Sequence, residues 1–264
     1  MNAPLTVAIS PCPNDTFIFG AWILGLTPDR TGRPARFAWA DVEELNRAAE
    51  RQRFDVIKMS AATALELEEH YEILPTGSAF GAGVGPKLVV RPDGPQRPAT
   101  IAVPGLKTTA FAVLRAALGH DFSPVPMLFS NIVDAVANGK VDAGLLIHET
   151  ALVYDRYGLE LRLDLGAWWA EQGAGTPMPL GVIAVRRSLP ESLRQGVAQT
   201  LRASLELARK DSAPIWPLIR ALAQELDNAT LNAHIKAYVT DMSLDMGPMG
   251  VLALDRLRTI TQNP

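Results

Sequence analysis

Four short polar segments, far apart in the sequence, each follow a predicted strand and precede a predicted helix. They are residues 10–16, 58–60, 105–110 and the pair His148 and Glu149. Hydroxyl groups and the free amide groups at a helix start bind anions such as carboxylates. A histidine titrates near neutral pH and can accept a proton. Together these residue types predict a site that binds a small carboxylated molecule and removes a proton from it.

His148 is the candidate base. It ends the apolar run GLLIH, which predicts a strand over 141–149 that is buried on both faces. At the carboxyl end of such a strand the imidazole could face a ligand, although a single histidine can also be purely structural. The His-Glu pair does not begin a metalloprotease helix, because Leu152 stands four residues after His148 where a second histidine would be needed.

The other three segments supply candidate binding groups. Asn14 lies in SPCPNDT, where it, Asp15 or Thr16 could cap a helix and leave amide groups free for an anion. Thr108 and Thr109 in LKTTA offer hydroxyl donors at another helix start, and KMS at 58–60 offers Ser60 and Lys58 from a facing lobe. Helix capping alone could explain each segment, but their shared position at strand ends favours binding.

Cys12 and the pair Trp168 and Trp169 each allow two interpretations. Cys12 could be a buried small residue or a nucleophile, and the absence of a neighbouring His or Lys in the sequence favours the first. The tryptophans could form flat apolar walls for a ring or could pack at a hinge. A single cysteine excludes an internal disulfide and a cysteine-rich zinc site, and the four histidines lack ligand spacing, so no metal is expected.

Composition excludes several partners. The 264 residues carry 25 Lys plus Arg and 28 Asp plus Glu, a formal charge of -3, without a basic run for nucleic acid. No window approaches the apolar length of a membrane helix, and the first residues lack the features of a signal peptide, so we expect a cytoplasmic protein. The glycines of GAGVG at 81–85 precede Pro86 and a strand, so they do not form a dinucleotide loop, and no cofactor is expected.

Strands and helices alternate through the first two thirds of the chain, which predicts an α/β fold. Predicted strands are 6–10, 36–42, 55–60, 88–90, a segment from 100, 124–129, 141–149 and 180–187. Predicted helices are 15–25, 43–52, 61–71, 109–119, 131–139 and a series from 189 onward.

The same plan is used twice in this pattern, since RFDVIKMSAATA and KVDAGLLIHETA run alike from turn to strand to polar corner. The Gly- and Pro-rich segments 77–100 and 173–181 would connect two lobes. We therefore expect one lobe from residues 1–90 with 180–264 and another from 91–179. The cleft between them would hold the site, and the carboxyl-terminal helices would pack on the first lobe.

SPCPNDTFIFGAW at 10–22 closely resembles the opening signature of the 1,4-dihydroxy-6-naphthoate synthase family, which acts on the futalosine route to menaquinone. Matching stretches follow in the family's order over nearly the whole chain: KMSAATA, GAGVGPKLVV, VPGLKTTA, AGLLIHE, YGLELRLDLGAWW, PMPLGVIAVRR and YVTDMSLDMG.

The resemblance implies a two-lobed periplasmic-binding-protein-like fold of type 2, with mixed, mostly parallel sheets flanked by helices. It implies a lyase that converts cyclic dehypoxanthine futalosine to 1,4-dihydroxy-6-naphthoate and dihydroxyacetone without a cofactor. His148 matches the family's proton acceptor. The substrate-contacting segments match Lys58, Met59 and Ser60, and Thr109 with Ala110.

Two alternatives remain open. Chorismate dehydratase has the same fold and serves the same pathway, although SPCPNDTF and the histidine after GLLI favour the synthase. A non-catalytic protein that closes on a carboxylate would use the same cleft.

Overall fold

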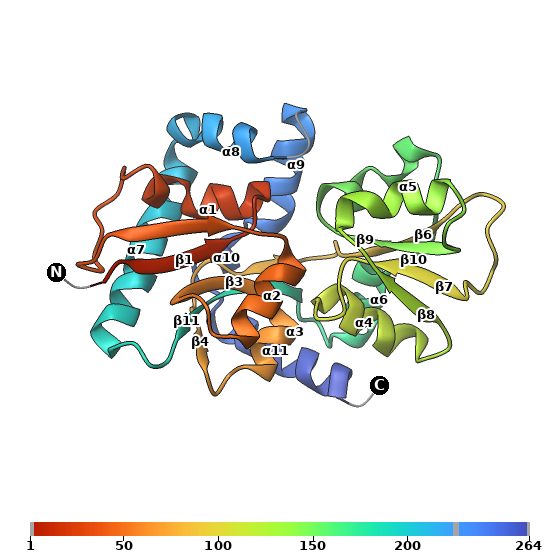
Figure 1. Ribbon diagram of the computed structural model, residues 1–264, viewed down its shortest axis with the longest axis horizontal. Helices are drawn as coiled ribbons and strands as arrows, with labels where there is room; N and C mark the ends of the chain where they lie inside the picture. Colours follow the sequence, from red (N-terminus) through yellow and green to blue (C-terminus); the bar gives the residue numbers. More distant parts are fainter. Residues whose placement is uncertain (1–2, 224–226, 263–264) are drawn as a thin grey trace.

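Two mixed β-sheets, one in each lobe, form the framework of the protein (Figure 1). The computed structural model describes residues 3–223 and 227–262. The first sheet has the order β2-β1-β3-β11-β4, with β5 also paired to β11, and the second has the order β10-β6-β9-β7-β8. The strands are β1 (Leu5–Ile9), β2 (Ala35–Trp39), β3 (Val56–Ser60), β4 (Tyr71–Ile73), β5 (Ala79–Gly81), β6 (Lys87–Val90), β7 (Thr100–Val103), β8 (Ser123–Pro126), β9 (Ala143–Leu146), β10 (Glu160–Asp164) and β11 (Met178–Arg186).

Helices surround both sheets. They are α1 (Pro13–Ile23), α2 (Val42–Glu50), α3 (Ala61–Glu66), α4 (Thr109–Leu118), α5 (Ile132–Ala137), α6 (Leu165–Gln172), α7 (Glu191–Lys210), α8 (Trp216–Leu222), α9 (Asn228–Tyr238), α10 (Asp241–Leu244) and α11 (Gly247–Gln262). Short 3-10 helices follow β8 and β9. Among the described residues, no helix is long and apolar enough to cross a membrane.

The two lobes repeat one arrangement of three parallel strands. β1 lies between β2 and β3 in the first sheet, and β7 lies between β8 and β9 in the second. An aspartate before the third strand joins it to the first in both lobes. Asp55 accepts from the amide and hydroxyl of Thr6, and Asp142 accepts from the amides of Ala99 and Thr100. These equivalent hydrogen bonds agree with the internal repeat predicted from the sequence.

Both sheets are mixed and mostly parallel, as expected, and one strand in each sheet runs against the others. β11 runs antiparallel to β3, β4 and β5, and β6 runs antiparallel to β9 and β10. The strands near the two crossings between lobes, β6 and β11, therefore run against their neighbours. Because β6 belongs to the second sheet, residues 87–90 lie with the second lobe and not with the first as expected.

The other differences between predicted and observed elements occur in short apolar segments, where sequence patterns do not separate helices from strands well. The helix predicted over 61–71 ends as α3 at Glu66, and β4 follows it. The strand predicted over 141–149 is shorter, since β9 ends at Leu146. The short strands β5 and β10 were not predicted.

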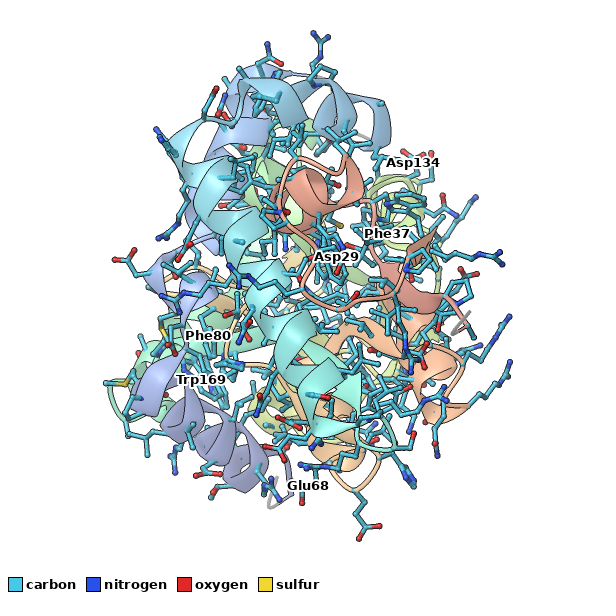
Figure 2. The ribbon with its side chains drawn as sticks, turned by 90° about the vertical axis from the view of Figure 1, so that its left-hand side faces the viewer. Asp29, Phe37, Glu68, Phe80, Asp134 and Trp169 are labelled. Carbon is cyan, nitrogen blue, oxygen red and sulfur yellow. The ribbon has the colours of Figure 1, made fainter. Side chains whose placement is uncertain are left out.

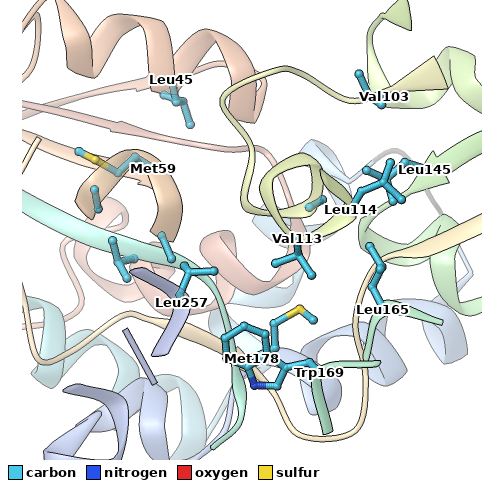
Figure 3. Close-up of a cluster of buried hydrophobic side chains, with 14 of the residues drawn as sticks. Leu45, Met59, Val103, Val113, Leu114, Leu145, Leu165, Trp169, Met178 and Leu257 are labelled. Atoms are coloured by element: carbon cyan, nitrogen blue, oxygen red, sulfur yellow. The ribbon is translucent and has the colours of Figure 1, made fainter. Parts of the chain in front are cut away.

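One apolar core crosses from lobe to lobe. Figure 3 shows Leu45 and Met59 from the first lobe and Leu145 from the second as parts of one buried cluster, with Trp169 beneath them. In Figure 2 the exposed Glu68 points outward, whereas Phe80 and Trp169 are each only 1% exposed. The shared core joins elements of both lobes beside the cleft.

The carboxyl-terminal helices pack on the first lobe, as predicted. α7, α8 and α9 contact α1, and α11 contacts α3 and β11. α11 also contacts α4 of the second lobe, so this region touches both lobes. α9 further contacts the 3-10 helix His148–Leu152, which brings residues far apart in the sequence together.

Candidate active site in the cleft between the lobes

A cavity of about 620 Å³, counting the space at its mouth, lies between the lobes. Its walls come from α1, β3, α4, the segment after β9, α9 and β11. The lining residues are Asn14, Val42, Lys58, Ser60, Ala79, Pro86, Thr108, Thr109, Ala110, Ile147, His148, Leu180, Gly181, His234 and Tyr238.

All but one of the residues predicted from the sequence lie around this cavity. The exception is Met59, whose fully buried side chain packs in the apolar core with Leu45 (Figure 3). Side chains alternate across a strand, so Lys58 and Ser60 share one face of β3 and Met59 takes the other. The side chain of Met59 therefore points away from the cavity.

His148 was predicted to lie at the end of a strand. It lies instead two residues beyond β9, at the start of a 3-10 helix. Its φ of 57° places it in the left-handed region, which histidine adopts more readily than most residues. One side of its ring packs edge-on against Phe129, with ring centroids 4.9 Å apart. The backbone turn and this contact together aim the imidazole at the cavity. The side chain of Glu149 is not among those that the structure describes.

Burial lowers the pKa of His148 to about 4, and the ammonium of Lys58 acts in the same direction, whereas the carboxylate of Asp15 opposes it. The imidazole is therefore neutral at pH 7, and a neutral imidazole can accept a proton. The negative charge of Asp15 favours the imidazolium that this transfer would form.

A buried ion pair lies beside the cavity. The ammonium of Lys58 donates to Oδ1 of Asp15 over 2.6 Å, and both side chains are almost fully buried. Asp15 was expected to be one possible helix cap, but α1 begins at Pro13 and Asp15 lies within its first turn. Because a buried charge is costly without a partner, Asp15 and Lys58 depend on each other.

Asn14 links this ion pair to a second histidine. Its side-chain amide donates to Oδ1 of Asp15, and its carbonyl oxygen lies 3.0 Å from Nε2 of His234. A carboxylate only accepts, so the amide orientation is fixed and Nε2 of His234 must carry the proton. Burial lowers the pKa of His234 to about 3, with the charges of His148 and Lys58 adding to the shift.

Sequence reasoning missed His234 and Tyr238, which α9 brings into the cavity wall. Their ring centroids are 4.9 Å apart, and the ring of His234 lies 6.2 Å from that of His148. The sequence held no signal for this, because a lone histidine in a helix of the carboxyl-terminal region resembles any buried polar residue.

Ser60 keeps a hydroxyl proton available for a ligand. Its oxygen accepts from Nδ2 of Asn46, and its own amide donates to Oδ1 of the same side chain. Within residues 3–223 and 227–262, the Ser60 hydroxyl has no acceptor of its own. This agrees with the predicted role of Ser60 as a donor to the substrate.

The hydroxyls of Thr108 and Thr109 make different contacts from those predicted. Thr108 caps α4, accepting from the amide of Phe111 and donating to the carbonyl of Gly105. Thr109 accepts from the amide of Ala62 and donates to the carbonyl of Leu180. Each hydroxyl proton is already engaged, so neither is free to donate to a carboxylate.

The start of α4 offers backbone donors instead. In the part of the chain that the structure describes, the amides of Thr109 and Ala110, the first two of the helix, have no acceptor. Both residues line the cavity, and the positive end of the helix dipole favours an anion there. At this position the amides, and not the threonine hydroxyls, are the groups that can donate to an anion.

The two tryptophans lie outside the cavity wall. Trp169 is buried in the interlobe core and donates to the carbonyl of Thr176, and neither it nor Trp168 lines the cavity. This favours the hinge-packing interpretation.

No group of three or more His, Cys, Asp or Glu residues suited to a metal ion occurs among the described residues.

Comparisons with known proteins identify the family of the chain. A family model described as menaquinone biosynthesis matches residues 5–263. Two relatives are both named 1,4-dihydroxy-6-naphthoate synthase. The Thermus thermophilus protein is 41% identical over 256 residues, which cover 96% of this chain and 92% of the relative. The Streptomyces coelicolor protein is 40% identical over 263 residues, which cover 97% of this chain and 92% of the relative.

Solved structures confirm the two-lobed, periplasmic-binding-protein-like fold. A protein from Archaeoglobus fulgidus matches with a TM-score of 0.93 at 33% identity, covering 98% of this chain and 97% of that one. The ligand-binding component of an ABC-type import system from Staphylococcus aureus has a TM-score of 0.70 at 11% identity, covering 98% and 91%. At that identity the second match shows the fold alone. The long match to the family model and the two close relatives decide membership: the chain belongs to the menaquinone biosynthesis family.

Proposed function

We propose that this protein is a 1,4-dihydroxy-6-naphthoate synthase, a carbon-carbon lyase that converts cyclic dehypoxanthine futalosine to 1,4-dihydroxy-6-naphthoate and dihydroxyacetone in the cytoplasm. The two named relatives support this reaction. The observation that carries the proposal is a single cavity lined by a neutral histidine, a serine hydroxyl and the start of α4.

Binding of the substrate is assigned to groups on both lobes. The amides of Thr109 and Ala110 would hold the carboxylate at the positive end of α4. Ser60 would donate to a second oxygen from the first lobe. Because these donors belong to different lobes, a substrate that bridges them would favour closure of residues 1–86 with 178–264 on residues 87–177.

His148 is assigned the role of general base. The neutral imidazole would take a proton from the sugar-derived part of the substrate, and cleavage of a carbon-carbon bond would follow. Formation of the aromatic naphthalene ring would provide much of the driving force. Asp15 would stabilise the imidazolium, since its charge already favours the protonated form of His148. Closure would exclude water from the reacting carbon.

A turnover assay tests the proposal. Purified protein is incubated anaerobically with cyclic dehypoxanthine futalosine and, separately, with chorismate, and the products are separated and identified. We expect equal amounts of 1,4-dihydroxy-6-naphthoate and dihydroxyacetone from the first substrate and no reaction with the second. Release of 3-enolpyruvyl-benzoate from chorismate would identify a chorismate dehydratase instead. Tight binding of the futalosine derivative without conversion would identify a binding protein.

A further inference from the structure

We propose that Lys58 is a catalytic residue that stabilises the enolate oxygen formed when His148 takes its proton, and that Asp15 and Gly181 are positioning residues for Lys58. This inference rests on the proposed function. It assigns the stabilisation of the enolate intermediate to the buried ammonium of Lys58.

The ammonium of Lys58 is a buried cation, and not all of its N–H groups are used in hydrogen bonds. Lys58 is 6% exposed and lines the same cavity as His148. An ammonium carries three N–H donors, and among the described residues only Asp15 accepts from it. The remaining donors are available to an oxygen atom in the cavity. Charge stabilisation by a fixed donor in a site that excludes water is stronger than in solution.

Asp15 holds Lys58 in place without access to the ligand. Its Oδ1 accepts from Lys58 and Asn14, and its Oδ2 accepts from the amide and hydroxyl of Ser10. The residue is fully buried and does not line the cavity. Four hydrogen bonds thus keep the carboxylate fixed, and the carboxylate keeps the ammonium at the cavity wall.

Gly181 leaves room for the Lys58 side chain. β11 pairs with β3 so that Gly181 lies opposite Ser60. A Cβ atom at position 181 would approach Cε of Lys58 to 2.7 Å and Nζ to 3.4 Å. Any side chain there would displace the ammonium, while backbone conformation places no demand for glycine at this position. This glycine is therefore explained by the path of Lys58.

The charges in the step balance. The proton moves from substrate carbon to the imidazole, which becomes imidazolium, and the electron pair left on carbon spreads to an adjacent carbonyl oxygen as an enolate. Lys58 keeps all its protons and donates a hydrogen bond to that oxygen. Lys58, His148, His234 and Tyr238 line the cavity where the new charges form, and Asp15 is the anion behind Lys58.

The product provides a direct probe, because its ring hydroxyls can occupy the position of the enolate oxygen. 1,4-Dihydroxy-6-naphthoate is bound under nitrogen to wild-type protein and to Lys58→Met, and the naphtholate absorption is followed against pH. A cation at hydrogen-bond distance should lower the pKa of the bound hydroxyl by about one to three units. We expect this lowering in the wild type and its loss in Lys58→Met.

A matched control removes another partly buried cation far from the cavity. Arg194 pairs with Glu72 over 2.7 Å, and its side chain is 19% exposed. Arg194→Met should bind the product as the wild type does, with the same pKa of the bound hydroxyl. In turnover, Lys58→Met should lose about 100- to 1000-fold in kcat with a smaller change in KM.

Gly181→Ala keeps the lysine and displaces its ammonium, so it tests the inference even where Lys58→Met fails to fold. Its bound product should show the raised hydroxyl pKa expected for Lys58→Met. An equal pKa in the wild type and in both variants would overturn the inference alone. Failure of the wild type to bind the naphthoate would overturn the proposed function and the inference with it.

Discussion

The sulfur of Cys12 lies 3.5 Å from Nδ1 and 3.6 Å from Nε2 of His148. The sequence suggested no histidine near this cysteine, because the two residues are 136 positions apart. Both distances are within hydrogen-bond range for sulfur and are almost equal, so the sulfur does not pair with one ring nitrogen in preference to the other. This geometry is unlike the in-line pair that activates a cysteine nucleophile.

Cys12 should therefore be dispensable for the chemistry. We expect Cys12→Ala to keep kcat within about tenfold of the wild type, since it removes packing against His148 but no reacting group. Initial rates measure this, with circular dichroism to confirm the fold. A loss comparable to that of a His148 variant would instead make the thiol a participant.

Thr109 should act through closure of the cleft. Its hydroxyl bridges the amide of Ala62 and the carbonyl of Leu180, so Thr109→Val removes hydrogen bonds from two partly buried backbone groups. We expect KM to rise by about tenfold or more and kcat to change less. Thr109→Ser keeps the bridge and serves as the matched control. Equal KM values for the two variants would contradict this role.

The pH dependence of activity should reflect the lowered pKa of His148. With a pKa of about 4, the imidazole stays neutral as pH falls from about 7.5 to about 5.5, so kcat/KM should change by less than about twofold. A histidine at its ordinary pKa of about 6.5 would lose roughly tenfold in its neutral form by pH 5.5. A tenfold fall in kcat/KM over this range would show that the base is not buried as described.

The free energy of unfolding should decrease as pH is lowered, because His234 is buried in its neutral form. The unfolded chain protonates this histidine near pH 6.5, but the folded chain does so only near pH 3, so protons favour unfolding between these values. His234→Gln can still donate to Asn14 and does not titrate. Between pH 7 and pH 5, urea unfolding should show a loss of stability about 2 kcal/mol smaller in this variant. Equal losses would mean that the wild-type histidine is already charged in the folded protein.

The sequence allowed the lobes and most of the cavity wall to be predicted, for identifiable reasons. Continuous apolar runs such as Ala143–Leu146 indicate strands buried on both faces, and polar residues at strand ends converge in space. Strand alternation could also have excluded Met59, since Lys58 and Ser60 already occupy the cavity face.

Other features depend on contacts between distant segments. Nothing local reveals that α9 places His234 beside Asn14, or that Ala62 and Leu180 use the hydroxyl of Thr109. The left-handed backbone conformation of His148 was also not predictable from the sequence, because an apolar run ending in histidine predicts a longer strand than β9. Such features arise from tertiary packing, which short-range patterns do not encode.

Exchange of His148 for asparagine tests the central claim most directly. Asparagine tolerates the left-handed backbone conformation at this position but cannot act as a base near neutral pH. Single-turnover experiments with cyclic dehypoxanthine futalosine separate binding from chemistry. We predict that His148→Asn binds the substrate within about tenfold of the wild type and converts it at least about 100-fold more slowly. Conversion at a rate near that of the wild type would contradict the assignment of His148 as the base.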